Sequence, residues 1–143
     1  METTRSIVIV EDSDEDYEVM QRALRKLEVT PPITRLVGGD ECIAYLENVV
    51  KAGERGNEKP AIVLLDLNLP GTDGREVLQH IKRNEILKSI PVAVLTTSSN
   101  PKDIENCYRE GANSYIVKSM DFEKFTRTVG LLVQYWLDAA SLP

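Results

Sequence analysis

Short apolar runs alternate with segments of helical periodicity along the whole chain. The first, third and fourth runs are apolar at nearly every position, which is typical of strands covered on both faces. We predict strands at residues 6–10, 33–37, 61–65, 91–95 and 114–117, and helices at residues 14–27, 39–51, 74–84, 101–110 and 121–137. This regular alternation predicts an α/β fold built around a parallel sheet.

Polar residues mark several ends of the predicted helices. Asp14 is placed to cap the first helix, and the acids Glu15 and Asp16 suit the positive end of its dipole. We interpret all three as capping and solvated positions. The segment 111–113, which starts with glycine, closes the fourth helix.

The 143 residues predict a single domain, with a core of about residues 5–137 and a short C-terminal extension. The longest polar loop covers residues 52–60, before the third strand. No apolar stretch approaches the roughly 20 residues that a membrane span needs, and no signal peptide is visible. We therefore expect a cytoplasmic protein. The net charge of −6, without a run rich in Lys and Arg, gives no indication of nucleic-acid binding.

The cysteine and histidine content argues against two common kinds of site. Cys42 and Cys107 lie far apart in helical segments, and we interpret both as structural. His80 is the only histidine and lies in a predicted surface helix. Neither a zinc site nor a Ser/His/Asp triad is supported.

Polar residues with useful chemistry follow four of the predicted strands. Asp66 follows the third strand, and the pair Glu11-Asp12 follows the first. Thr96 and Lys118 follow the fourth and the fifth. Because parallel strands end at one edge of the sheet, we expect these side chains to meet there. Three carboxylates would repel one another unless a cation joined them, and the whole set suits phosphoryl transfer.

The order and spacing of these residues match one protein family. Glu11-Asp12, the run Asp66-x-Asn68-x-Pro70-x-x-Asp73-Gly74, Thr96 and Lys118 are all in register. The chain resembles the receiver domain of two-component response regulators over residues 5–137. Its last residues and its long loop before the third strand resemble the small stand-alone receivers that serve phytochrome-type histidine kinases.

The resemblance implies a fold and a reaction. The implied fold is flavodoxin-like, with five parallel strands in the order 2-1-3-4-5 and helices on both faces. Asp66 would accept a phosphoryl group from a kinase histidine. Asp12, Asp66 and the backbone carbonyl of Asn68 would bind Mg²⁺, with Mn²⁺ or Ca²⁺ as substitutes, and Glu11 would act through water. Lys118 would pair with a phosphoryl oxygen.

Further roles follow from the same resemblance. The Thr96 hydroxyl would move toward the phosphoryl group while Tyr115 changes its rotamer. Asn68 and Ser98 occupy the two positions that tune how fast water removes the phosphoryl group. Ser119 departs from the family pattern, since many receivers have proline there, and we expect a trans bond between Lys118 and Ser119.

Output is expected through a surface of the last helix. A stripe at helical spacing contains Phe122, Phe125, Val129, Leu132, Val133 and Trp136. Leu131, Tyr135 and Leu137 widen it, so the stripe either covers the sheet alone or also forms a face for a partner or a homodimer. We name Leu131, Tyr135 and Trp136 as candidate interface residues.

Three alternatives to a phosphorylated response regulator stay open at this point. One is a pseudo-receiver that binds partners without phosphorylation, and another is a receiver cut from a longer transcription factor. The third is a phosphatase with Asp66 as nucleophile. Such enzymes commonly need an acid two residues on, where this chain has Asn68. We expect a phosphoacceptor switch and not an enzyme that turns over a separate substrate.

Overall fold

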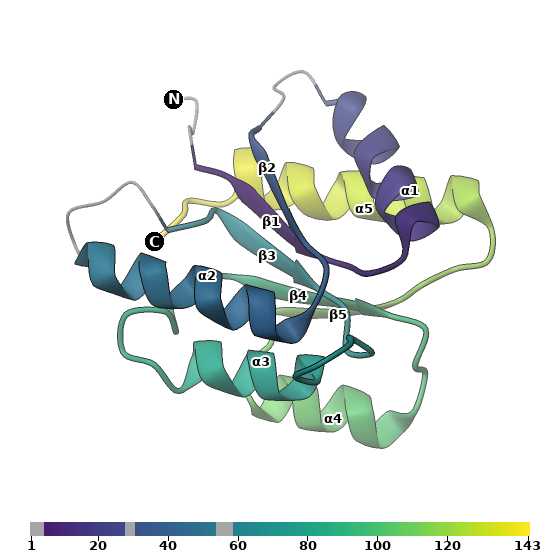
Figure 1. The fold of residues 1–143 in the computed structure, drawn as a ribbon. Helices are drawn as coiled ribbons and strands as arrows, with labels where there is room; N and C mark the ends of the chain where they lie inside the picture. The colour runs from purple at the N-terminus through teal and green to yellow at the C-terminus, as the bar shows by residue number, and fades with distance from the viewer. Residues whose placement is uncertain (1–4, 28–30, 54–58) are drawn as a thin grey trace.

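Five parallel strands form the central layer of the protein in the computed structural model, in the order β2-β1-β3-β4-β5 (Figure 1). The strands are β1 (Ile7–Val10), β2 (Ile33–Leu36), β3 (Ile62–Leu65), β4 (Val92–Thr96) and β5 (Ser114–Val117). The structure describes residues 5–27, 31–53 and 59–143, so residues 54–58 of the predicted long loop lie outside it. The predicted fold class and strand order are confirmed.

Helices cover both faces of this sheet (Figure 1). One face carries α1 (Asp14–Arg25) and α5 (Phe122–Gln134), and the other carries α2 (Gly39–Ala52), α3 (Gly74–Lys82) and α4 (Pro101–Arg109). Within the described residues, no helix is both long enough and apolar enough to span a bilayer.

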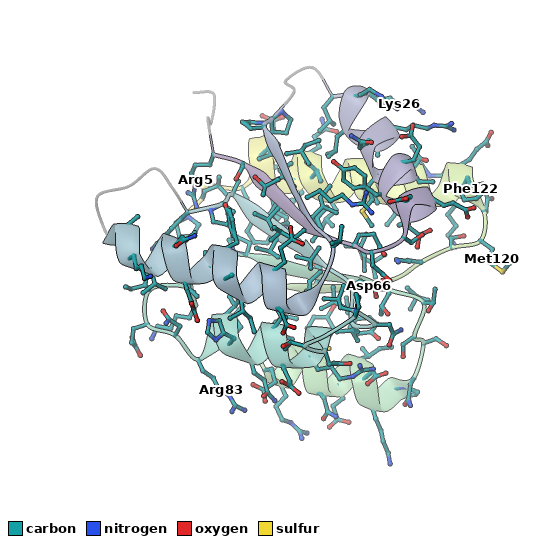
Figure 2. All side chains as sticks on the ribbon, viewed as in Figure 1. Arg5, Lys26, Asp66, Arg83, Met120 and Phe122 are labelled. Carbon is teal, nitrogen blue, oxygen red and sulfur yellow. The ribbon has the colours of Figure 1, made fainter. Side chains whose placement is uncertain are left out.

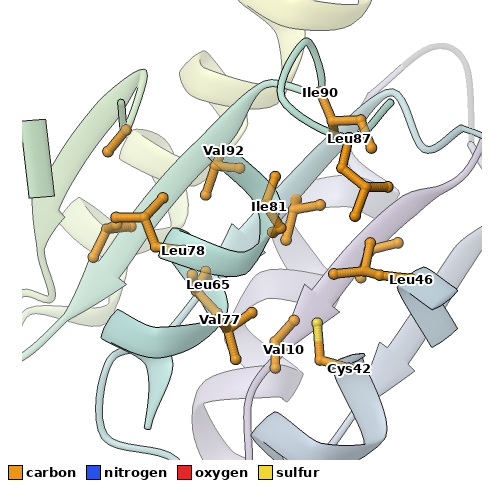
Figure 3. Close-up of a cluster of buried hydrophobic side chains, with 14 of the residues drawn as sticks. Val10, Cys42, Leu46, Leu65, Val77, Leu78, Ile81, Leu87, Ile90 and Val92 are labelled. Atoms are coloured by element: carbon orange, nitrogen blue, oxygen red, sulfur yellow. The ribbon is translucent and has the colours of Figure 1, made fainter. Parts of the chain in front are cut away.

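Alternate residues of the strands point into two separate cores. In β1, Val8 and Val10 pack toward α2 and α3, whereas Ile7 and Ile9 pack toward α1 and α5. Figure 3 shows the first of these cores, where Cys42 lies buried among aliphatic side chains. Full burial of each large aliphatic side chain contributes roughly 1.5–3 kcal/mol. The continuous apolar strands of the sequence are explained by this burial on both faces.

The start of α1 corrects one prediction from the sequence. Ser13, not Asp14, is the N-cap, because its extended backbone lets its side chain accept a hydrogen bond from the Asp16 amide at 3.2 Å. Asp14 is the first helical residue and forms an ion pair with Arg35 at 2.8 Å.

The end of the chain differs from the single predicted helix. Asp121 caps α5, which ends at Gln134, and a π-helical turn, η2 (Tyr135–Ala139), follows it. Phe125, Val129 and Val133 are buried against the sheet as expected. Phe122 is 60% exposed, so this member of the apolar stripe does not cover the sheet. It is the first residue of α5.

Candidate functional site

Three carboxylates converge at the carboxyl edge of the sheet, where β1 and β3 end side by side. Glu11, Asp12 and Asp66 each offer an oxygen, and these atoms lie within 4.8 Å of one another. They meet because Val10 and Leu65, which precede them, are paired in the parallel register of β1 and β3. Glu11 and Asp66 are buried, whereas Asp12 is exposed. Figure 2 labels Asp66 at this edge.

Lys118 reaches this cluster from the end of β5. Its Nζ lies 2.6 Å from Glu11 Oε1 and 2.9 Å from Asp66 Oδ2, and its side chain is 6% exposed. The Lys118 amide donates to the Thr96 carbonyl at 2.8 Å, which fixes the backbone as it leaves the sheet. The structure therefore brings together four of the side chains that the sequence placed at this edge.

Asp16 is a member of the site that the sequence analysis missed. Its Oδ2 lies 2.7 Å from Lys118 Nζ, and its side chain is 28% exposed, so it is not simply a solvated residue of the first helical turn. The available signal was position: a helix that begins two residues after Asp12 must carry its first turn next to the site. We call Glu11, Asp12, Asp16, Asp66 and Lys118 the acidic centre.

The acidic centre holds more negative charge than one ammonium group balances. Burial raises the pKa of Glu11 to about 7, although its contact with Lys118 acts in the opposite direction. Burial acts to lower the pKa of Lys118, but hydrogen bonds to Asp16, Glu11 and Asp66 outweigh it and raise that pKa above its usual value. The centre contains four carboxylates and only one lysine. The carboxylate oxygens are hard donors, so the site fits a divalent cation.

Arg35 supports the loop that carries the acids, and the sequence analysis missed it too. From β2, its guanidinium donates to the Glu11 carbonyl at 3.1 and 3.2 Å, and it stacks 4.3 Å from the centre of the Tyr17 ring. The Ser13 amide also donates to Glu11 Oε2 at 3.1 Å. These contacts, from the neighbouring strand β2 and from the start of α1, hold the loop that carries the carboxylates in place.

The loop after β3 is also tightly held. The backbone N–H of the exposed Asn68 donates to Asp66 Oδ1 at 3.2 Å. The start of α3 approaches so closely that a Cβ at Gly74 would overlap the Asp66 carbonyl oxygen. Further along the loop, the Thr72 hydroxyl and amide both donate to Asp40 at the start of α2. The backbone around Asp66 is therefore packed from two sides.

Thr96 ends β4 and is fully buried, whereas the adjacent Thr97 is exposed. The Ser98 amide points to Thr96 Oγ1 at 3.5 Å, and the Tyr115 hydroxyl donates to the Ser98 carbonyl at 2.9 Å. Thr96, Ser98 and Tyr115 thus form one connected group. The described residues contain no cis peptide bond, so the bond between Lys118 and Ser119 is trans as predicted.

The candidate interface residues lie away from the acidic centre. Leu131 and Tyr135 are 64% and 55% exposed, and the rings of Tyr135 and Trp136 meet edge to face at 5.3 Å. They border a hollow of about 450 Å³ that is lined by Asn113, Ser114, Ile116, Thr128, Leu131, Leu132, Tyr135 and Trp136. This hollow lies beside the start of β5, whereas Lys118 follows its end.

The fold and the acidic centre together define a flavodoxin-like α/β protein with a carboxylate–lysine site at the carboxyl edge of its sheet. Residues 7–130 match the model of the response regulator receiver domain. The chain belongs to this family, and its place in two-component signalling is established by that match.

Similar proteins refine this assignment. The phosphorylated cyanobacterial phytochrome response regulator RcpA is 40% identical, with a TM-score of 0.88 and coverage of 97% of this chain and 98% of its own. The Mn²⁺-bound form of response regulator Rcp1 is 38% identical, with a TM-score of 0.87 and coverage of 97% and 99%. The predicted likeness to phytochrome-associated receivers is confirmed.

A relative from a different source is similar to nearly the same extent. The probable methanogenesis regulatory protein FilR2 of Methanothrix harundinacea is 42% identical over 131 residues, which cover 92% of this chain and 83% of that protein. The relatives of this chain therefore include regulators that are named for different processes.

Proposed function

We propose that this chain is a response regulator that accepts a phosphoryl group on Asp66 from a sensor histidine kinase, in a reaction that depends on Mg²⁺. The contact of 2.9 Å between Lys118 and Asp66, within a cluster of further carboxylates, carries this proposal. A buried ammonium beside a strand-end carboxylate suits phosphoryl transfer to that carboxylate, since in such reactions the protein mainly orients groups and neutralises charge.

The proposed transfer uses the residues of the acidic centre. An oxygen of Asp66 attacks the phosphorus atom, the bond to the kinase histidine breaks, and the electron pair returns to that histidine. Lys118 orients Asp66 beforehand and neutralises a phosphoryl oxygen afterwards. Asp12, Asp66 and the Asn68 carbonyl would hold Mg²⁺, with Glu11 contributing through water, and the bound ion would neutralise charge on the phosphoryl oxygens. The Mn²⁺-bound form of Rcp1 supports a divalent ion here.

Phosphorylation would change a surface at some distance from Asp66. The added charge of roughly −1.5 to −2 draws the Thr96 hydroxyl toward the phosphoryl group. Tyr115 follows, because its hydroxyl is bonded to Ser98, two residues after Thr96. The result is a population shift in α4, β5 and α5 between two packings. Asn68 and Ser98 are proposed to tune the rate of hydrolysis.

The proposed partner is a phytochrome-type histidine kinase. The likeness to RcpA and Rcp1, at 40% and 38% identity across nearly the whole chain, supports it. The test is transfer from a labelled phytochrome kinase, compared with labelled kinases of other sensory classes. Preference for the phytochrome kinase supports the assignment, and equal or slower transfer from it contradicts the assignment.

A homodimer formed by Leu131, Tyr135 and Trp136 is the second proposed contact. The exposure of the first two and the hollow beside them support it, since a single chain gains nothing from exposing large apolar side chains. Sedimentation with and without acetyl phosphate tests it, with Tyr135→Ala as the variant. We expect Tyr135→Ala to shift the monomer–dimer equilibrium toward the monomer relative to the wild type. An unchanged equilibrium contradicts the proposed surface.

Intact mass after incubation with acetyl phosphate and Mg²⁺ tests phosphorylation itself. We expect one phosphoryl adduct on the wild-type chain, and none on Asp66→Asn or in the presence of a chelator. Glu15→Gln is the control, because Glu15 is an exposed acid of the same helical turn as Asp16. An unmodified wild-type chain, in conditions that modify another receiver, would favour the pseudo-receiver instead.

A further inference from the structure

Arg75 forms a fork-shaped contact between the starts of α3 and α4. Its Nε and Nη2 donate to the two carboxylate oxygens of Asp103 at 3.0 and 2.9 Å. Its Nη1 donates to both oxygens of Asp73 at 3.1 Å, and Asp73 is the N-cap of α3. One guanidinium therefore joins the end of the loop that follows Asp66 to the first turn of α4. We call Arg75, Asp73 and Asp103 the Arg75 latch.

The Arg75 latch also holds the side chain of Ser98. The Ser98 hydroxyl donates to Asp103 Oδ2 at 2.6 Å, and it accepts a hydrogen bond from the Asn100 amide at 3.3 Å. Asp103 thus receives two N–H groups from Arg75 and one O–H group from Ser98. The hydrogen bonds from Arg75, and to a smaller extent the one from Ser98, keep the pKa of Asp103 below its usual value.

Ser98 is in turn bonded to both residues of the proposed switch. Its amide points to Thr96 Oγ1 at 3.5 Å, and its carbonyl accepts the Tyr115 hydroxyl at 2.9 Å. A residue held by its side chain from one direction and by its backbone from another has little freedom to move. The backbone of the loop between β4 and α4 is therefore fixed at Ser98, while the side chains of Thr96 and Tyr115 on either side of it keep their own rotations.

We propose that Arg75 and Asp103 are positioning residues for phosphoryl binding: by fixing Ser98, they hold the backbone of the loop between β4 and α4 in place, so that the Thr96 hydroxyl moves toward the phosphoryl group from a fixed position. This inference rests on the proposed phosphorylation of Asp66 and adds a group that acts on it from outside the acidic centre. Two parallel N–H···O bonds define the geometry of the contact, which a lysine at position 75 would not reproduce.

The chain offers a matched control for this contact. Arg83, which follows α3, forms an ion pair of 2.8 Å with Glu110, which follows α4. This second pair joins the same two helices at their opposite ends, whereas Ser98 lies before the start of α4. Replacing Arg83 therefore reports the general effect of weakening the packing of α3 on α4.

The experiment is a titration with beryllofluoride, a mimic of the phosphoryl group, in the presence of Mg²⁺. We expect Arg75→Met to weaken binding by about fivefold, a typical size for coupling between sites. Arg75→Lys should weaken binding nearly as much as Arg75→Met does, because lysine keeps the positive charge but cannot form the two parallel hydrogen bonds to Asp103. Arg83→Met should bind as the wild type does. In a Thr96→Ala background, Arg75→Met should have no further effect, since the latch acts through that hydroxyl.

Each outcome decides the inference. Equal affinity of Arg75→Met and wild type overturns it, as does an equal loss in Arg83→Met, which would indicate helix packing alone. An undiminished effect of Arg75→Met in the Thr96→Ala background overturns the route through Ser98. If Arg75→Met does not fold, Arg75→Lys carries the comparison. A wild-type chain that does not bind beryllofluoride contradicts the proposed function, and the role of the latch with it, whereas a failure confined to the Arg75 variants concerns the latch alone.

Discussion

The acidic centre and the surface formed by Leu131, Tyr135 and Trp136 differ in whether their side chains are paired within the chain. At the acidic centre, Lys118 is surrounded by three carboxylates of its own chain, and each contact is shorter than 3 Å. At the C-terminal surface, Leu131 and Tyr135 are largely exposed. The first region is built by contacts within the chain, whereas the second is proposed to contact another molecule.

The two regions differ because a buried charged group must have a partner, whereas an exposed apolar side chain needs none. Buried charges must be paired or neutralised, so the partners of the charged groups in the acidic centre are found within the site itself. Exposed apolar side chains carry no such requirement, and one observation of exposure is compatible with several partners. Substitutions in each region test this contrast, and the largest effect is expected at the acidic centre.

Removing Lys118 should damage the acidic centre most. Lys118→Met leaves Glu11 and Asp66 buried without their cation, so we expect the free energy of unfolding at pH 8, without metal, to fall by about 3 kcal/mol. Lys88→Met is the control, because its pair with Glu85 is exposed and should contribute less than about 1 kcal/mol. Denaturant titration measures both, and equal effects would contradict the contrast between buried and exposed pairs.

Glu11 should make the metal-free protein less stable as the pH rises. Its pKa is raised by burial to about 7 in the folded chain, against 4.5 as the ordinary value. Between these values the folded state binds more protons than the unfolded state, so stability is lost as the pH rises from about 4.5 to 7. Glu11→Gln should flatten this part of the profile. An identical slope in wild type and variant, measured by denaturant titration in chelator, would contradict the assignment.

Two positions of α5 test whether the C-terminal surface is dispensable for folding. Val133→Ala removes buried side-chain atoms and should cost about 1–3 kcal/mol. Leu131→Ser changes a side chain that is 64% exposed and should cost less than about 0.5 kcal/mol. Thermal unfolding at low protein concentration compares them. A larger cost for Leu131→Ser would show that this surface belongs to the core of the single chain.

The fold is predictable from the sequence because parallel strands buried on both faces need apolar residues at consecutive positions. The ends of these strands then place Glu11, Asp66 and Lys118 at a common edge on sequence grounds alone. The family resemblance placed Thr96 at the same edge, and the structure buries Thr96 and exposes the adjacent Thr97. The functional roles of these residues stay predictions.

The parts that sequence reasoning missed depend on side-chain direction across elements. Asp16 has the sequence context of a solvated residue in a first turn, yet its contact with Lys118 joins positions separated by 102 residues. No sequence motif marks Arg35 or Arg75. An arginine on a strand or helix surface is most often solvated, so residue type alone gives no reason to assign either one a structural contact. The cap at Ser13 and the exposure of Phe122 depend on local backbone geometry, which residue type alone does not determine.

The central claim is that Asp66 carries the phosphoryl group, and chemical trapping tests it most directly. The chain is incubated with acetyl phosphate and Mg²⁺, reduced with borohydride, digested and mapped by mass spectrometry. Borohydride reduces an acyl phosphate to an alcohol, so we predict homoserine in place of the aspartate at position 66, and unmodified acids at Asp12 and Glu11. Homoserine at another position, or none in conditions that trap another receiver, would contradict the account.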